Sequence, residues 1–117
     1  MKTTEAITAL SALAHEHRLA VYRLLVEQGP AGLSAGAIAE RIGLVPSSLT
    51  FHVQALQRAG LIRMRRVSRQ VFYTVDFAAM KKLVDYLTEN CCGQSAASCA
   101  PNCRPIGAKP RRSQRAA

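Results

Sequence analysis

Apolar residues recur every three or four positions through the first half of the chain, which is the spacing of amphipathic helices. Two such stretches cover residues 4–14 and 16–30, and a Gly-Pro pair ends the second. Two shorter helical stretches follow, one capped by Ser34 and one started by Pro46 with Ser47 or Ser48 near its cap. Because only GLVP joins these two, the sequence predicts a helix-turn-helix.

The period changes after Gly60. Residues 61–76 alternate apolar and polar positions around a short polar centre, Ser-Arg-Gln, which is typical of a β-hairpin. A last amphipathic helix follows, and Asp76 can cap it. The predicted fold class is mainly α with a β-hairpin wing, a winged helix-turn-helix over residues 1–90. We expect residues 91–103 to form a separate cysteine-bearing segment, whose chemistry is taken up below, and residues 104–117 a basic, disordered tail.

Charge separates one interval from the rest of the chain. The formal net charge is +9, and no carboxylate lies between Glu40 and Asp76, an interval that holds six arginines. This distribution predicts a polyanionic partner, most simply double-stranded DNA, with a solvated surface strip as the alternative. No apolar run approaches the roughly 20 residues of a membrane span, and the first residues do not form a signal peptide. We therefore expect a cytoplasmic protein with no membrane partner.

The stretch from Ser47 divides into two faces. Leu49, Val53 and Leu56 recur at i, i+4 and i+7 and predict a core face. The opposite face offers hydroxyls and an amide to base edges, and the hairpin arginines suit phosphates or the minor groove. Phe51 can contact thymine methyl groups or serve in packing. The predicted DNA-binding residues are Ser47, Ser48, Thr50, Phe51, Gln54, Arg63, Arg65, Arg66 and Arg69.

The three histidines are not predicted to act as ligands. His52 lies at helical spacing from core leucines, so we expect it to be buried and hydrogen-bonded. His15 and His17 are two residues apart and cannot share a helix face, so they are interpreted as ordinary positions at a helix start.

Two stretches resemble a known family. SSLTFHVQALQRAGLIRMRR resembles the recognition helix and the start of the wing in the ArsR/SmtB repressors, and HRLAVYRLL resembles their second helix. The resemblance covers about residues 5–90. It implies a homodimer, not an enzyme, that represses transcription and leaves DNA when it binds a metal or metalloid. The first and last helices would form the dimer, and their exposed apolar residues would be Ile7, Leu10, Met80, Leu83 and Leu87.

All four cysteines lie within ENCCGQSAASCAPNC, at Cys91, Cys92, Cys99 and Cys103. Cytoplasmic thiols stay mostly reduced, so the cluster indicates metal binding or redox chemistry rather than structural disulfides. Three thiolates with no nearby histidine suit a soft ion. The family's familiar ligand positions are empty, because LSAGAIAER has no cysteine and the last helix has no histidine.

A Cys-Cys pair with a downstream cysteine after the last helix resembles an arsenite-sensing branch of the family. That resemblance implies Cys91, Cys92 and Cys99 as ligands of arsenite or antimonite, the inducer; Cys103 has no clear counterpart. Alternatives stay open: Zn²⁺ or Cd²⁺ at the same cysteines, thiol oxidation, or an inert tail. A vicinal-thiol reductase would need a base beside the thiols, and Glu89 is the one carboxylate near them in the sequence, with no nearby histidine. A purely architectural DNA-binding protein would respond to no inducer.

Overall fold

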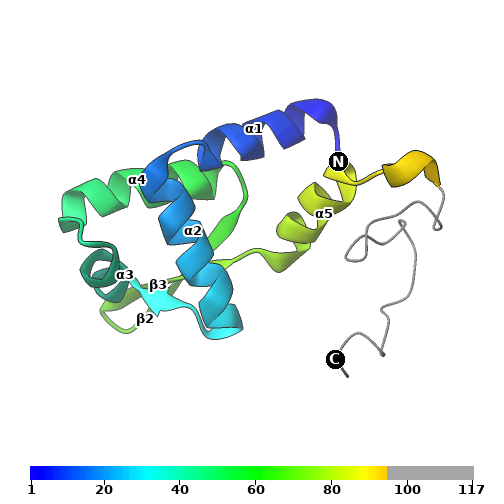
Figure 1. Ribbon diagram of the computed structural model, residues 1–117. Helices are drawn as coiled ribbons and strands as arrows, with labels where there is room; N and C mark the ends of the chain where they lie inside the picture. Colours follow the sequence, from blue (N-terminus) through cyan, green and yellow to red (C-terminus); the bar gives the residue numbers. More distant parts are fainter. Residues whose placement is uncertain (95–117) are drawn as a thin grey trace, which may run out of the picture. The chain divides into compact units, whose positions relative to one another are not determined.

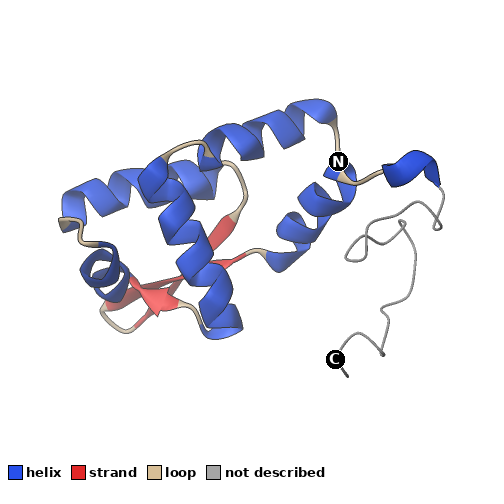
Figure 2. Cartoon of the chain, viewed as in Figure 1, coloured by secondary structure: helices blue, strands red, loops and turns tan. Residues whose placement is uncertain are grey.

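The computed structural model describes residues 1–94 (Figures 1 and 2). One compact unit spans Met1–Leu83, and a second begins at Val84. The expectations for Cys99, Cys103 and residues 104–117 lie outside the described residues. The elements are α1 (Thr3–Leu13), α2 (Glu16–Gln28), the 3-10 helix η1 (Gly29–Ala31), β1 (Leu33–Ser34), α3 (Ala35–Ile42), α4 (Pro46–Arg58), β2 (Ile62–Val67), β3 (Gln70–Val75), α5 (Phe77–Leu87) and the 3-10 helix η2 (Cys91–Gln94).

The helix-turn-helix forms as the sequence predicts. The Ser34 hydroxyl accepts a hydrogen bond from the Ala37 N–H at 3.2 Å and caps α3. Gly43 ends α3 with φ of 82°, a left-handed conformation that glycine adopts without strain. The predicted start of α4 at Pro46 is confirmed: its N-cap residue is Val45, and Ser47 and Ser48 lie close to it in the first turn. Pro46 at the first helical position lacks an N–H, which leaves one fewer group to cap.

The wing is a three-stranded antiparallel sheet in the order β1-β3-β2. The β2–β3 hairpin is confirmed, while the two-residue strand β1 was too short to show a period. Leu33 of β1 pairs with Tyr73 of β3. Gly32 makes this pairing possible, because its φ is 69° and a Cβ there would overlap the Tyr73 carbonyl oxygen.

Helix α2 lies at the centre of the first unit, where it contacts α1, α3, α4 and β3 (Figure 1). Its buried side joins the apolar sides of α3 and α4, so the predicted core face of α4 is confirmed. The core packs the start of the wing against the helix-turn-helix and thereby fixes α4 relative to the hairpin. The fully buried large side chains are Leu25, Ile38, Leu49, Leu56, Leu61, Val21 and Val53.

Helix α1 turns small residues inward and large ones outward. Ala6, Ala9 and Ala12 are buried, whereas Ile7 is 57% exposed and Leu10 is 41% exposed. The predicted dimer contact by Leu83 is wrong, because this side chain is only 6% exposed within a single protomer. Within the described residues, no helix has both the length and the apolar character needed to cross a membrane.

Candidate nucleic-acid interface and cysteine site

Helix α4 presents a polar face that its core residues hold in place. Ser47, Thr50 and Gln54 are exposed, and Ser48 is half-buried. The Thr50 hydroxyl donates to the Pro46 carbonyl oxygen at 3.0 Å, so its lone pairs stay available as acceptors. The division of α4 into two faces is therefore confirmed, and contact of these residues with DNA stays a prediction.

Phe51 lies on the exposed face of α4 and is 61% exposed. Its ring makes an edge contact with His52, with centroids 5.8 Å apart. The guanidinium carbon of Arg18, from α2, lies 5.9 Å from the Phe51 ring centroid, a cation–π arrangement. Sequence analysis missed Arg18, because the two residues are far apart along the chain. The contact places a further positive charge beside the face predicted to meet DNA.

The hairpin extends into solvent. In β2 only Ile62 is buried. Arg66 and Arg69 lie closest to the turn and are exposed. Arg65 is exposed too, and its guanidinium carbon lies 5.8 Å from the centroid of the Phe72 ring on β3. Beyond Arg63 at its base, the wing therefore carries three exposed arginines with no carboxylate on either strand, an arrangement suited to phosphate contacts.

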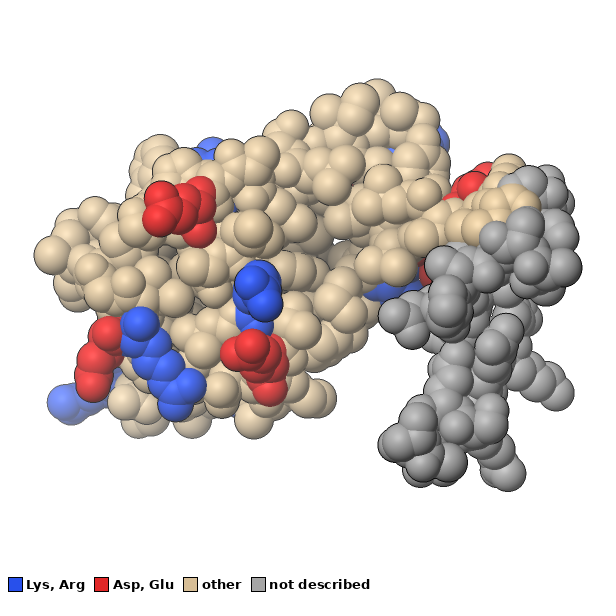
Figure 3. Space-filling model, in the orientation of Figure 1, with Lys and Arg blue, Asp and Glu red and all other residues tan. Residues whose placement is uncertain are grey.

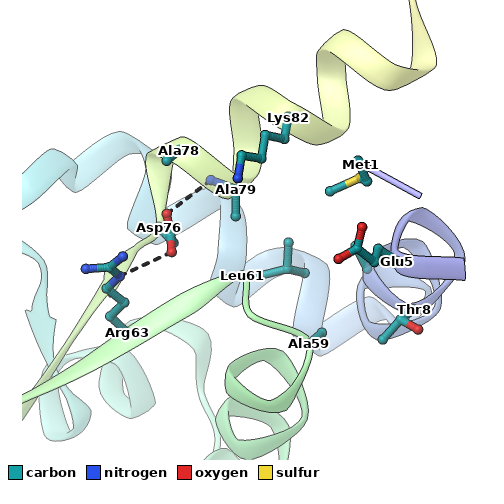
Figure 4. A pocket seen from close by; sticks show the side chains of 11 residues that line it. Met1, Glu5, Thr8, Ala59, Leu61, Arg63, Asp76, Ala78, Ala79 and Lys82 are labelled. Atoms are coloured by element: carbon teal, nitrogen blue, oxygen red, sulfur yellow. Dashed lines mark hydrogen bonds and ion pairs between the residues drawn. The ribbon is translucent and has the colours of Figure 1, made fainter. Parts of the chain in front are cut away.

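Arg63 differs from the other hairpin arginines. It lies at the base of β2, and its Nε donates to the Asp76 carboxylate at 3.1 Å (Figure 4). The other Asp76 oxygen accepts from the Ala79 N–H at 3.0 Å and caps α5, as predicted. The Ala79 hydrogen bond, followed by Arg63, holds the pKa of Asp76 below its usual range. Arg63 is thus partnered before DNA arrives, and its predicted DNA contact is untested.

The Arg63–Asp76 pair borders a pocket of about 390 Å³ (Figure 4). Helix α1, the α4–β2 junction and the start of α5 enclose it. Glu5 and Lys82 add one charge of each sign to its wall. The face of the molecule seen in Figure 3 likewise shows positive and negative side chains beside one another rather than a single-sign patch.

The histidines depart from the sequence-based interpretation. His52 is buried at 9% exposure, as expected, but its Nδ1 has no hydrogen-bond partner, contrary to expectation. His15 is the N-cap of α2 and lies outside the helix, so the argument from helix faces did not apply to it. The rings of His15 and His17 both approach His52.

The Cys91-Cys92 pair begins the short helix that follows α5. Cys91 is half-buried and Cys92 is exposed, and their sulfur atoms lie 3.3 Å apart. Cys92 has φ of 57°, a left-handed conformation uncommon for cysteine. In residues 1–94 no group of three His, Cys, Asp or Glu side chains is placed to hold a metal ion. The described structure therefore contains two of the three predicted thiol ligands.

Known proteins share this fold and about a third of the aligned sequence. Residues 13–65 match the family model of a helix-turn-helix domain. The transcriptional activator HlyU of Vibrio cholerae is 32% identical over 85 residues, which cover 73% of this chain and 76% of that protein. A solved HlyU structure has a TM-score of 0.60 over 74% of this chain and 97% of that chain, at 33% identity. An ArsR-like transcriptional regulator from Rhodococcus sp. RHA1 is 30% identical, with a TM-score of 0.62 over 72% of this chain and 76% of its own.

The chain belongs to the ArsR/SmtB-like family of winged helix-turn-helix transcriptional regulators. The similar proteins are named as regulators of transcription and not as enzymes. Their names differ in the direction of regulation. HlyU is named an activator, whereas another relative is the biofilm growth-associated repressor of Xylella fastidiosa. That repressor is 29% identical over 80% of this chain and 79% of its own length. The helix-turn-helix match ends before Cys91, so it says nothing about what this family member senses.

Proposed function

We propose that this regulator represses transcription by binding operator DNA as a homodimer and is released when trivalent arsenic or antimony binds its thiolates. The observation that carries the proposal is the Cys91-Cys92 pair directly after the last helix of a DNA-binding fold. A third thiol, Cys99, follows in the sequence. Three thiolates form a soft donor set that matches the inducer in both charge and coordination number.

The sulfur spacing of the pair supports a pyramidal ion. Two thiolates on a tetrahedral Zn²⁺ lie roughly 3.8 Å apart, since each Zn–S bond is about 2.3 Å long. The Cys91 and Cys92 sulfurs are closer, at 3.3 Å. In trivalent arsenic or antimony a lone pair compresses the angles between the sulfur ligands, which brings the sulfurs together. The spacing of the pair is thus compatible with these ions.

The DNA-binding half of the proposal rests on two exposed surfaces. The polar face of α4, which includes Thr50 and Gln54, offers hydrogen-bonding groups to base edges in the major groove. The wing arginines Arg66 and Arg69 offer charge to the phosphate backbone. Because α4 is fixed on the core and the wing is fixed by β3, one protomer can place both surfaces on the same half-site.

The dimer rests on the apolar face of α1. Ile7 and Leu10 are large and exposed, while the same helix buries alanines inside its own protomer. A dimer would cover this face and carry two recognition helices to half-sites about one helical turn apart. Ile7→Glu should therefore sediment as a monomer and bind operator poorly, whereas Leu19→Glu, a similar exposed change on α2, should stay dimeric. A wild-type monomer at micromolar concentration would contradict the dimer.

Release requires the ion to favour the DNA-free form. Linkage makes this effect reciprocal: the ion weakens DNA binding by the same factor by which DNA weakens ion binding. Such couplings are typically about 1–3 kcal/mol. In this proposal, Cys99 joins Cys91 and Cys92 around the ion, and ion binding shifts the two recognition helices out of register with the groove.

A fluorescence-anisotropy titration tests the proposal. Wild-type protein is bound to labelled promoter DNA, and arsenite, antimonite, Cd²⁺, Zn²⁺ or a thiol oxidant is then added. Arsenite and antimonite should release the DNA, and Cys91→Ser, Cys92→Ser or Cys99→Ser should bind DNA normally yet ignore them. Cys103→Ser should keep most of the response. Release by Zn²⁺, Cd²⁺ or oxidant alone would replace the proposed inducer with one of the alternatives.

A further inference from the structure

Three histidines meet where the start of α2 contacts the recognition helix α4. The ring centroids of His15 and His52 are 4.7 Å apart, and those of His17 and His52 are 5.6 Å apart. His15 and His17 are separated by 5.7 Å. The only three histidines of the chain therefore gather at one joint, directly behind the face of α4 that carries Phe51.

His52 occupies a position that does not tolerate charge. Its side chain is 9% exposed, and the buried Nδ1 has no hydrogen-bond partner. The ionisable groups that act on it are His15, Arg18 and His17, all from the start of α2. Burial first, and then these three neighbours, lower the pKa of His52. Positive charge on either neighbouring imidazole would add electrostatic repulsion between the side chains at this joint.

His15 adds a second reason why the joint depends on neutral imidazoles. It is the N-cap of α2, and its Nδ1 accepts a hydrogen bond from the His17 N–H at 3.1 Å. Only the unprotonated nitrogen has a lone pair to accept this bond. Protonation would turn the acceptor into a donor, remove the cap, and place a cation at the positive end of the helix dipole.

A proton is the ligand that suits this cluster as it stands. Across residues 1–94, no set of three potential metal ligands, these histidines included, is arranged to hold an ion. The nearby Arg18 would also oppose a metal cation, since it contributes positive charge to the same surroundings.

We infer that His15, His17 and His52 form an acid-sensitive joint that loosens the recognition helix and lowers operator specificity when the pH falls. A histidine of the unfolded chain takes up a proton at about pH 6.5, whereas burial lowers the pKa of His52, so the effect begins as the pH falls below that value. Stability is intact above it and is lost as the pH falls, because the unfolded chain takes up protons that the joint resists. The inference rests on the proposed operator binding.

Added charge acts on DNA in two ways, and the experiment must separate them. Imidazolium groups near the interface attract any DNA, whereas a loosened α4 weakens only the contacts that select the operator. The informative quantity is therefore the ratio of the dissociation constants for scrambled and operator duplexes. It is measured with the full chain at about 0.15 M salt and compared between about pH 7.5 and about pH 5.5.

The wild-type ratio should fall about fivefold over this range, the size expected for the loss of an N-cap. His15→Asn with His17→Gln keeps a capping side chain and removes two of the three imidazoles, so its ratio should fall less than that of the wild type. The control is Glu27→Gln, an exposed change at the other end of α2 that removes a negative charge and leaves all three histidines in place. Its ratio should fall as in the wild type.

Thermal melting without DNA gives a second readout that does not depend on the proposed function. Acid should lower the melting temperature of the wild type more than that of the doubly substituted protein. Equal losses in the two proteins, or an unchanged wild-type ratio, would overturn the inference. A shift in DNA affinity caused by micromolar Zn²⁺ or Ni²⁺ and abolished by the double substitution would assign the cluster to a metal instead. If no protein binds operator at about pH 7.5, the proposed function fails, while the melting comparison still decides the joint.

Discussion

The winged helix-turn-helix unit and the Cys91-Cys92 pair differ in what holds their side chains in place. In the first unit, residues such as Leu25, Ile38 and Leu56 are fully buried, and the helices that carry them each pack against several other elements. The cysteine pair is half-buried at one position and exposed at the other. The comparison teaches that the first region owes its geometry to apolar burial, whereas the second offers donor atoms to a ligand. Substitutions should therefore change stability in one region and response in the other.

The largest effect should come from the core. Leu56→Ala removes a side chain with no exposed surface and should lower the free energy of unfolding by about 2–5 kcal/mol. Leu19→Ala makes the same chemical change at an exposed position of α2 and should cost about 0.5 kcal/mol or less. Urea unfolding measures both. Similar losses would mean that burial does not distinguish these positions.

A pair of glycines sharpens the same point at the level of the backbone. Gly32→Ala would force a Cβ against the Tyr73 carbonyl oxygen at a positive φ, and should lower the free energy of unfolding by about 1–3 kcal/mol. Gly36→Ala adds a methyl group to open space within α3 and should be neutral or stabilising by up to about 1 kcal/mol. Thermal denaturation followed by circular dichroism should rank the two variants in this order.

Within the DNA-binding surface, Gln54 should act on sequence choice. Gln54→Ala should cost about 1–3 kcal/mol on the preferred operator and little on random DNA if, as proposed, the exposed amide contacts base edges. Competition binding with both duplexes gives the difference. An equal loss on both would reassign Gln54 to the phosphate backbone.

Two hairpin arginines should differ in a smaller quantity, the salt dependence of binding. Arg69→Ala should reduce the slope of log K against log salt by about 0.9 for each lost phosphate contact. Arg63→Ala should change the slope less, because Arg63 is already paired with Asp76. If both substitutions flatten the slope equally, Arg63 contacts DNA as the sequence analysis predicted.

Much of the fold was predictable because short-range chemistry determines it. Ser34 caps the start of α3, Gly43 ends it, and Asp76 caps α5, as their residue types indicate. Features that depend on chain topology were not accessible. The contact of Arg18 with Phe51 and the meeting of His15 with His52 join residues far apart in sequence. The periodicity of apolar residues describes neighbours along one helix or strand and does not indicate which distant residues meet.

The cysteine site divides in the same way. The adjacency of Cys91 and Cys92 is written in the sequence, and the structure adds the distance between their sulfurs. Under the proposed function, an ion would bring Cys99 to them, and sequence alone does not give the geometry of the resulting site. Donor identity is thus predictable from sequence, whereas ligand geometry is not.

The central claim is that the thiols after α5 sense arsenite while the winged helix-turn-helix holds the DNA. The most direct test compares the full chain with a protein truncated after Asn90, both bound to labelled operator DNA and titrated with arsenite. Both should bind the operator with similar affinity, and only the full chain should be released. Release of the truncated protein by arsenite would contradict the account, because the sensing site would then lie within residues 1–90.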